Sequence, residues 1–387
     1  MDRIYLDYNA TTPLDPGVAS VMEAILRGGA GNPSSLHWFG QQARAAVETA
    51  RAEVAALVGA SPAELVFTGS GTEADNMALR GLAGAAPPGR RKVVISAIEH
   101  HAVLNSAKLL AEGGFTVEAV KAGEDGVVDV DDLARRVDGQ TAVVAIMLAN
   151  NETGVLQPVG DVVAVARAEG AAVHCDAVQA VGKIPVDAHA LGVDTLALSA
   201  HKLCGPQGVG ALFVKRGARL SALIRGGAQE RNRRAGTENV AGIAGFGRAA
   251  TLAKEALPFE AARLEPLRDL LESRLLSLPG ARRNGAAPRV ANTTNVSFGG
   301  ADAESLLMAL DLMGLAVSTG AACAAGAIEP SHVLRAMGLS TPRVQSSLRF
   351  SLGRSTTEAE VTRAADLVGE ALARQRALGR AHTSSRG

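Results

Sequence analysis

Cysteine is scarce in this chain of 387 residues, which contains Cys175, Cys204 and Cys323 and no others. No two of them form a Cys-x-x-Cys pair, and an odd number argues against a disulfide framework. Disulfides persist in oxidising environments. We therefore expect the chain to work in a reducing compartment, the cytoplasm.

The chain also lacks an excess of either charge and any long apolar run. Lys and Arg number 39 together, and so do Asp and Glu, so no general field attracts nucleic acid or anionic lipid. The first residues, MDRIYLDYNATTP, lack the basic-then-apolar pattern of a signal peptide, and no apolar run reaches membrane-spanning length. We expect no nucleic-acid or membrane partner.

Lysine is rare as well, since seven lysines leave 39 − 7 = 32 arginines. Lys202 follows the apolar run TLALSA and precedes GPQGVG. Ligands of open α/β sheets bind beyond the carboxyl ends of strands, and burial lowers a lysine's pKa, which suits an imine-forming amine. The other six lysines are expected mid-helix, beside turns or at solvated strand ends. The alternative is that Lys202 is an ordinary loop lysine.

The first two-thirds of the chain alternates apolar runs with helical patterns, which predicts an α/β fold. Helical patterns occur at 40–58, 101–112 and 159–169. Near-continuous apolar strands separated by helices indicate a mostly parallel, seven-stranded sheet covered on both faces. The strand-like runs are 65–68, 92–96, 116–120, 141–148, 171–176, 195–200 and 210–215.

The length favours two packed domains. At Leu257-Pro258 the pattern changes to a long charged helix, 259–277, and then to a smaller α+β arrangement. We expect a large domain spanning 14–257. A small domain would consist of 1–13 and 258–387.

Asp176 ends the run AAVHCD, and Gln179 follows three residues later. A pyridoxal phosphate ring needs a carboxylate beside its pyridine nitrogen to keep that nitrogen protonated. An amide such as that of Gln179 can hydrogen-bond the ring oxygen. An ordinary strand-end Asp that caps the next turn is the alternative.

The segment TGSGTEADN (68–76) lies between a strand and a helix. Free N–H groups in its glycine turn and the Thr72 hydroxyl at the helix start suit a phosphate. The segment is neither a Walker loop nor a dinucleotide-binding motif. A plain N-capped turn explains it equally well.

The histidine pair in IEHHAV (98–103) lies at a predicted strand end. An imidazole there can stack on a flat cofactor and exchange protons near neutral pH. A structural role is the alternative, and the pattern leaves open whether His100 or His101 matters.

Cys323 lies in the small-residue segment STGAACAAGAI (318–328), where nothing bulky anchors the chain. Such a segment should be mobile, as active-site loops are. A reactive thiol and an inert buried cysteine are both compatible with this pattern.

Arg349 places a guanidinium inside the otherwise apolar run SSLRFSLG. A buried charge needs a partner. The carboxylate of an amino-acid substrate would be a bidentate match, and a structural salt bridge is an equal alternative.

Together these residues resemble the cysteine desulfurases of the NifS/IscS type, a branch of the class V aminotransferases. The resemblance runs from YLDYNATTP to SSLRFSLGR, in the same order along the chain. Its specific motifs are GNPSS, GTEADN, the Glu-His pair, NNETG, DAVQAVGK, SAHK, RAGTENV and EPSHVLRAMG. It implies the fold type I of pyridoxal-phosphate-dependent transferases and the cofactor pyridoxal 5′-phosphate. No metal is expected.

The resemblance also implies residue roles. Lys202 would hold the cofactor, Asp176 would face its nitrogen, Gln179 its ring oxygen, and His100 would stack on the ring. Asn151 would approach the cofactor and the substrate, and Arg349 would bind the substrate carboxylate. The phosphate would be bound by Gly71, Thr72, Ser199 and His201, and by Thr237 of a neighbouring subunit, which implies a homodimer.

The activity implied is the conversion of L-cysteine to L-alanine through a persulfide on Cys323. The sulfur would pass to an acceptor protein, either an iron–sulfur scaffold or a tRNA-thiolation carrier. A selenocysteine lyase or a class V aminotransferase would use the same cofactor site without requiring Cys323 in this way. A docking platform for acceptor proteins is the non-enzymatic alternative.

Overall fold

The computed structural model describes residues 3–28, 31–320, 323–324, 327–328 and 330–384, with side chains for 3–28, 31–320 and 330–377. Its larger sheet has seven strands. In hydrogen-bonded order they are β2 (Leu65–Thr68), β8 (Gly210–Val214), β7 (Thr195–Ser199), β6 (Ala172–Asp176), β5 (Thr141–Met147), β3 (Lys92–Ser96) and β4 (Thr116–Val120). Strand β8 is antiparallel to both of its neighbours, and the remaining pairs are parallel. The prediction of a mostly parallel seven-stranded sheet is confirmed.

Helices cover both faces of this sheet, because its strands are apolar on both. In β3, Val94 joins one hydrophobic cluster, whereas Val93 and Ile95 join another, since successive strand side chains point to opposite faces. The Val93 face is covered by α3 (Gly71–Gly84) and α4 (His101–Glu112). The elements packed on the Val94 side are α1 (Pro16–Arg27), α2 (Trp38–Leu57), α5 (Val130–Arg136), α6 (Val159–Ala168) and the first half of α9 (Val240–Leu276).

A second, smaller core surrounds a three-stranded antiparallel sheet. Its strands, in order, are β14 (Ser347–Ser351), β10 (Thr293–Phe298) and β9 (Ala281–Arg283). Around them lie α10 (Ala303–Leu312), α13 (Glu358–Ser384) and the parallel pair β1 (Ile4–Tyr5) and β11 (Leu315–Ala316). Leu6 shares a hydrophobic cluster with Phe298 and Phe350, so the first residues pack with the last third of the chain.

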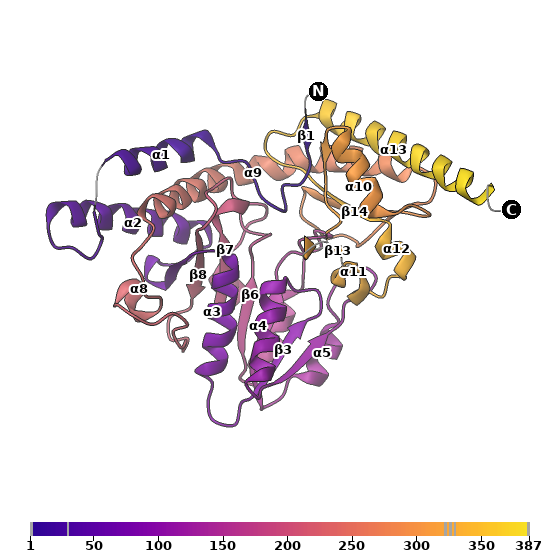
Figure 1. Ribbon diagram of the computed structural model, residues 1–387. Coiled ribbons are helices and arrows are strands. Elements are labelled where there is room, and N and C mark those ends of the chain that lie inside the picture. The colour runs from indigo at the N-terminus through magenta and orange to yellow at the C-terminus, as the bar shows by residue number, and fades with distance from the viewer. Residues whose placement is uncertain (1–2, 29–30, 321–322, 325–326, 329, 385–387) are drawn as a thin grey trace.

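Helix α9 connects the two cores without a break (Figure 1). The sequence predicted a helix beginning at residue 259, because a proline usually ends or kinks a helix. Instead the helix begins at Val240 and contains Pro258 and Pro266. Phe246 is buried in the core of the large sheet and Leu271 in that of the small sheet. The expected domain boundary therefore falls inside a helix, and the division into two domains stays a prediction.

Several short elements complete the chain. They are η1 (Pro62–Glu64), α7 (Ala188–Leu191), η2 (Ala200–Lys202), α8 (Gln229–Asn232), β12 (Cys323–Ala324), β13 (Ala327–Ile328), α11 (His332–Ala336) and α12 (Thr341–Gln345). Strands β12 and β13 pair antiparallel where the sequence predicted a loop. The loops after β2, β3, β5, β6 and β7 start from one edge of the sheet, because these strands run in the same direction.

Candidate active site

A cavity of about 380 Å³ lies at this edge, bounded also by the small sheet. Ten of the residues singled out from the sequence line it: Gly71, Thr72, His100, Asn151, Asp176, Gln179, Ser199, His201, Lys202 and Arg349. They come from segments as far apart as the first turn of α3 and strand β14. The fold thus brings the expected cofactor-binding and substrate-binding residues around one space.

Lys202 ends η2, directly after β7. Its Nζ donates to the backbone carbonyl oxygens of Asn9 at 2.5 Å and Ala10 at 2.6 Å. Burial, reinforced by the positive charge of Arg349, lowers the pKa of the Lys202 amine to about 8. A larger share of this amine is therefore unprotonated near neutral pH than in an exposed lysine, as nucleophilic attack on an aldehyde requires.

Asp176 ends β6 and is buried, with its Oδ1 accepting from the Val178 N–H at 2.9 Å. Burial raises the pKa of this carboxyl, while His100 and Lys202 shift it in the opposite direction. A cationic ring nitrogen beside Asp176 would favour its ionised form. The site is therefore arranged to receive a positive charge at this point.

The first turn of α3 faces the cavity with Gly71 and Thr72. The initial N–H groups of a helix have no partner within the helix, and the helix dipole favours an anion there. Ser199 Oγ is buried and has no hydrogen-bond partner among the described residues. A phosphate group would satisfy these donors together.

Both members of the histidine pair line the cavity. His100 caps α4, with its Nδ1 accepting from the Ala102 N–H at 3.1 Å, and burial lowers the pKa of its ring. The His101 ring lies 4.6 Å from the ring of His332, measured between centroids. His201 contacts the Thr11 hydroxyl at 3.1 Å, and burial lowers its pKa to about 4.

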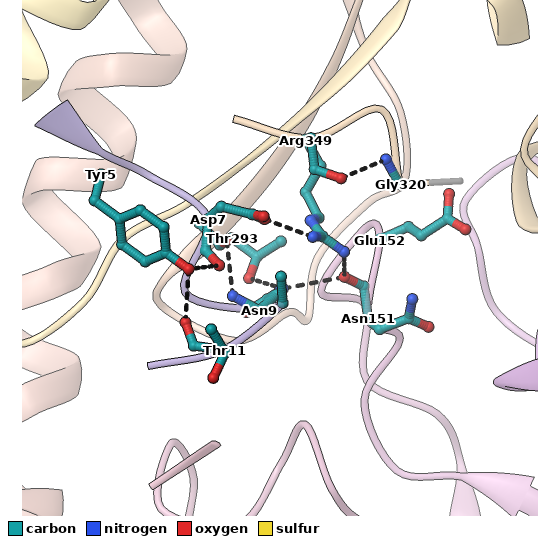
Figure 2. A network of polar contacts seen from close by, with 12 residues as sticks. Tyr5, Asp7, Asn9, Thr11, Asn151, Glu152, Thr293, Gly320 and Arg349 are labelled. Atoms are coloured by element: carbon teal, nitrogen blue, oxygen red, sulfur yellow. Dashed lines mark hydrogen bonds and ion pairs between the residues drawn. The ribbon is translucent and has the colours of Figure 1, made fainter. Parts of the chain in front are cut away.

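Arg349 forms the structural ion pair that was one of the two alternatives left open by the sequence, and its role toward a substrate stays a prediction. One of its terminal nitrogens donates to Asp7 at 2.6 Å and the other to the carbonyl oxygen of Asn151 at 3.0 Å (Figure 2). A structural ion pair therefore exists. The same side chain lines the cavity, and its Nε is buried without a partner among the described residues.

Two expected site residues are not among the described residues that line this cavity. Thr237 is exposed in the loop before α9. Cys323 lies in β12, but its side chain falls outside the described part of the structure. Gly320, the nearest residue on its amino-terminal side whose side chain is described, lines the cavity, and so does Ser318.

Other residues around the site were not singled out from the sequence. Asn9 binds Lys202 and Gln179 through its carbonyl oxygen, and Thr293 and Asn151 through its amide nitrogen (Figure 2). Its partners lie at least 142 positions away, so no local pattern reveals them.

Lys183 was not singled out from the sequence, where it was grouped with the lysines expected mid-helix, beside turns or at solvated strand ends. It is partly buried, and its Nζ donates to Gln179 Oε1 at 2.6 Å. The one available signal was its spacing, four residues after Gln179 in DAVQAVGK, which places the two side chains close together in a helix-like turn.

The comparisons with known proteins agree with this geometry. The family model "Aminotransferase class-V" matches residues 4–364. The chain belongs to the class-V aminotransferase family. A cysteine desulfurase from Nostoc sp. (strain PCC 7120 / SAG 25.82 / UTEX 2576) is 47% identical over 382 residues, covering 98% of this chain and 95% of the relative.

Solved structures of similar proteins have the same fold. A NifS-like protein has a TM-score of 0.90 at 39% identity, covering 96% of this chain and 99% of the other. SspA in complex with cysteine has a TM-score of 0.80 at 32% identity, covering 90% and 98%. The chain is a NifS-like cysteine desulfurase, from a family that depends on pyridoxal phosphate. No helix among the described residues is long and apolar enough to cross a membrane.

Proposed function

We propose that this enzyme converts L-cysteine to L-alanine with pyridoxal 5′-phosphate bound at Lys202, and transfers the sulfur to Cys323. One observation carries the proposal: an amine with a lowered pKa, a buried carboxylate and a guanidinium line the same cavity. They belong to Lys202, Asp176 and Arg349. SspA, a relative with the same fold, has been solved in complex with cysteine.

The residues around the cavity fit the cofactor. The first turn of α3, with Gly71 and Thr72, would hold its phosphate together with His201 and with the Ser199 hydroxyl, which has no partner among the residues that the structure describes. Asp176 and Gln179 would hold the ring nitrogen and ring oxygen, and His100 would cover the ring. When bound, the ring withdraws the electrons released at the substrate's Cα.

Arg349 would bind the substrate's carboxylate. Its guanidinium is held in place by Asp7 and by the carbonyl oxygen of Asn151, and its Nε has no partner in the described part of the chain. A planar, fixed guanidinium suits a carboxylate. The Asn151 side-chain oxygen, also buried and unpartnered among the described residues, would accept from the substrate's amino group.

Lys202 and His100 would carry out the proton transfers. An amine with a pKa of about 8 can both take and return a proton at the substrate's Cα near neutral pH. The lowered pKa of His100 leaves its ring neutral, so that it can accept the proton of the substrate thiol.

The sulfur step needs no external oxidant. The Cys323 sulfur bonds to the substrate sulfur as the substrate's carbon–sulfur bond breaks, and the carbon keeps the electron pair and takes a proton. L-cysteine and the Cys323 thiol thus become L-alanine and a Cys323 persulfide, with all atoms and electrons conserved. The persulfide's outer sulfur would then pass to an acceptor thiol.

We further propose a homodimer in the cytoplasm, with Thr237 completing the phosphate site of the neighbouring subunit. Its exposure in the loop before α9 is compatible with contact to a second chain. The acceptor would be a sulfur carrier, either an iron–sulfur scaffold or a tRNA-thiolation protein. Persulfide chemistry is favoured in the cytoplasm, where thiols are kept reduced.

The test measures sulfide and alanine released from L-cysteine in the presence of a thiol reductant. Wild type should release the two in equal amounts. Cys323→Ala should keep the cofactor's absorption spectrum and lose sulfide release. Cys204→Ala, the matched control two residues after Lys202, should behave as wild type. Full activity of Cys323→Ala would refute the persulfide step and favour lyase chemistry at the same Lys202 site.

A further inference from the structure

Lys183 is an amine close to the site for which the proposed reaction has no use. Its Nζ donates to two side-chain amide oxygens, Gln179 Oε1 at 2.6 Å and Asn9 Oδ1 at 2.8 Å. Both acceptors are uncharged. A partly buried lysine more often pairs with a carboxylate, because an isolated charge is costly to bury. It is therefore unusual that Lys183 donates to two amides where a carboxylate would be expected.

An amide has an oxygen at one end and an NH₂ group at the other, so fixing the oxygen fixes the direction of the nitrogen. With Oε1 held by Lys183, Gln179 directs Nε2 to the carbonyl oxygen of Asn9 at 2.8 Å. That leaves its second N–H for a ligand in the cavity, which Gln179 lines. The orientation of Gln179 thus depends on Lys183.

The second amide connects Lys183 to the reacting residues. The Asn9 carbonyl oxygen accepts from Lys202 Nζ at 2.5 Å. Its amide nitrogen donates to the carbonyl oxygen of Asn151 at 3.1 Å, and that same oxygen accepts from Arg349 (Figure 2). Lys183 therefore holds Asn9. Asn9 in turn contacts the Lys202 amine and the carbonyl oxygen that supports the Arg349 guanidinium.

We infer that Lys183 is a positioning residue of the desulfurase reaction, which acts through the amides of Gln179 and Asn9 to aim Lys202 and the Gln179 N–H at the bound cofactor. Small displacements of groups near a reacting centre have large kinetic effects, and supporting hydrogen bonds limit such displacements. The inference rests on the proposed function, because it assigns Gln179 to the cofactor.

The experiment compares wild type with Lys183→Met, both as holoenzyme. Methionine keeps the unbranched shape and removes every donor. The kcat for alanine release should fall about tenfold to a hundredfold, with a smaller change in KM. Lys108→Met, which replaces an exposed lysine of α4, should match wild type.

A second readout separates positioning from general destabilisation. An N–H donated to the ring oxygen stabilises its anionic form, so the pH at which the cofactor's absorption changes should rise in Lys183→Met by about 0.5 to 1 unit, the equivalent of one hydrogen bond. In Gln179→Ala, adding Lys183→Met should cost less than it does alone, because the two changes remove one interaction. A purely structural role would leave the absorption midpoint unmoved.

Unchanged kcat and an unchanged midpoint in Lys183→Met overturn the inference. If that variant does not fold, Lys183→Arg takes its place in the test, because arginine keeps N–H donors but displaces them from the position of the lysine Nζ. A kcat at least tenfold lower at an unchanged unfolding temperature supports positioning, and wild-type kcat refutes it. Absence of alanine release by wild type would instead refute the proposed function itself.

Discussion

At the scale of single residues, the environment of Lys202 determines its chemistry. Asp7 and Asp176 would keep the amine protonated, whereas burial and Arg349 favour the neutral form and prevail, so that the pKa falls to about 8. The backbone carbonyl oxygens of Asn9 and Ala10 hold the amine without adding a charge. The lysine is thus positioned and neutral over a wider pH range than an exposed one.

This pKa predicts how the protein without cofactor takes up pyridoxal phosphate. Attack on the aldehyde needs the unprotonated amine, so the uptake rate should rise with pH up to about 8 and then level off. A free lysine would continue to gain rate towards about 10.4. Stopped-flow absorbance at a series of pH values measures the midpoint.

Arg349→Met provides the comparison for that measurement. Because Arg349 lowers the pKa of Lys202, its removal should move the midpoint to higher pH. A wild-type rate that still rises tenfold per unit above pH 9.5 would contradict the prediction.

The sequence predicted the residues of this site better than it predicted their contacts. Asp176 is the last residue of a strand, Lys202 and Gly71 closely follow strands, and strand ends can be recognised locally. Asn9 and Lys183 could not be assigned in the same way, because their importance comes from partners that only the folded chain brings near. Arg349 was recognised as a charge in need of a partner, but Asp7 could not be identified as that partner.

At the scale of secondary-structure elements, the start of α3 rests directly on strand β8. A Cβ atom on Gly210 would lie 2.4 Å from the Ser70 carbonyl carbon and 2.8 Å from the Gly71 nitrogen. These are backbone atoms, which cannot rotate away as a side chain would. The glycine therefore lets the proposed phosphate-binding turn sit against the sheet.

Gly210→Ala should consequently weaken cofactor binding. The turn has to shift by several tenths of an ångström, which costs about 1–3 kcal/mol through overpacking and should raise the dissociation constant of pyridoxal phosphate about tenfold or more. Absorbance titration of the protein without cofactor gives that constant.

Gly160→Ala in α6 is the matched control, because a Cβ there meets no atom of the described residues within 4 Å. This variant should bind the cofactor as wild type does and gain about 0.5–1 kcal/mol of stability from helix propensity. Equal cofactor affinity in Gly210→Ala and wild type would show that the turn tolerates the shift.

The boundaries of helices and strands were predictable where polar or turn residues mark the end of an apolar run. The runs 65–68, 92–96 and 116–120 match β2, β3 and β4 residue for residue, because polar or turn residues end each apolar run. The beginning of α9 was missed, since Pro258 reads as a helix end. Strand β1 has two residues, too few for any periodicity to show.

At the scale of the whole molecule, the start of α2 and the residues just before it expose large apolar side chains. Leu36 is 89% exposed and Trp38, the one tryptophan of the chain, is 63% exposed, with Phe39 beside it. Apolar groups gathered in this way often mark an interface. They are compatible with the proposed homodimer, and we expect its contact to include the α1–α2 side.

Leu36→Asp should therefore shift the enzyme from dimer to monomer. A charge in the contact would be buried without a partner, at a cost large enough to dissociate a moderate interface. Sedimentation velocity at micromolar concentration would show the change, with a parallel loss of activity if Thr237 acts across the interface.

Leu312→Asp serves as the control, because Leu312 is 86% exposed on α10, far from this segment (Figure 1). That variant should sediment as wild type does. A Leu36→Asp protein that keeps the wild-type sedimentation coefficient would move the contact elsewhere.

The pair of Asp7 and Arg349 joins positions 342 residues apart. After Asp7, a ribosome must therefore add 342 residues before the guanidinium can meet the carboxylate that holds it. Until then Lys202 and Asp176 can already be in place on the large sheet, but the Arg349 guanidinium proposed to bind the substrate's carboxylate is missing. A growing chain without Arg349 would thus be unable to bind the substrate's carboxylate. No persulfide would form on Cys323 before the active site is complete.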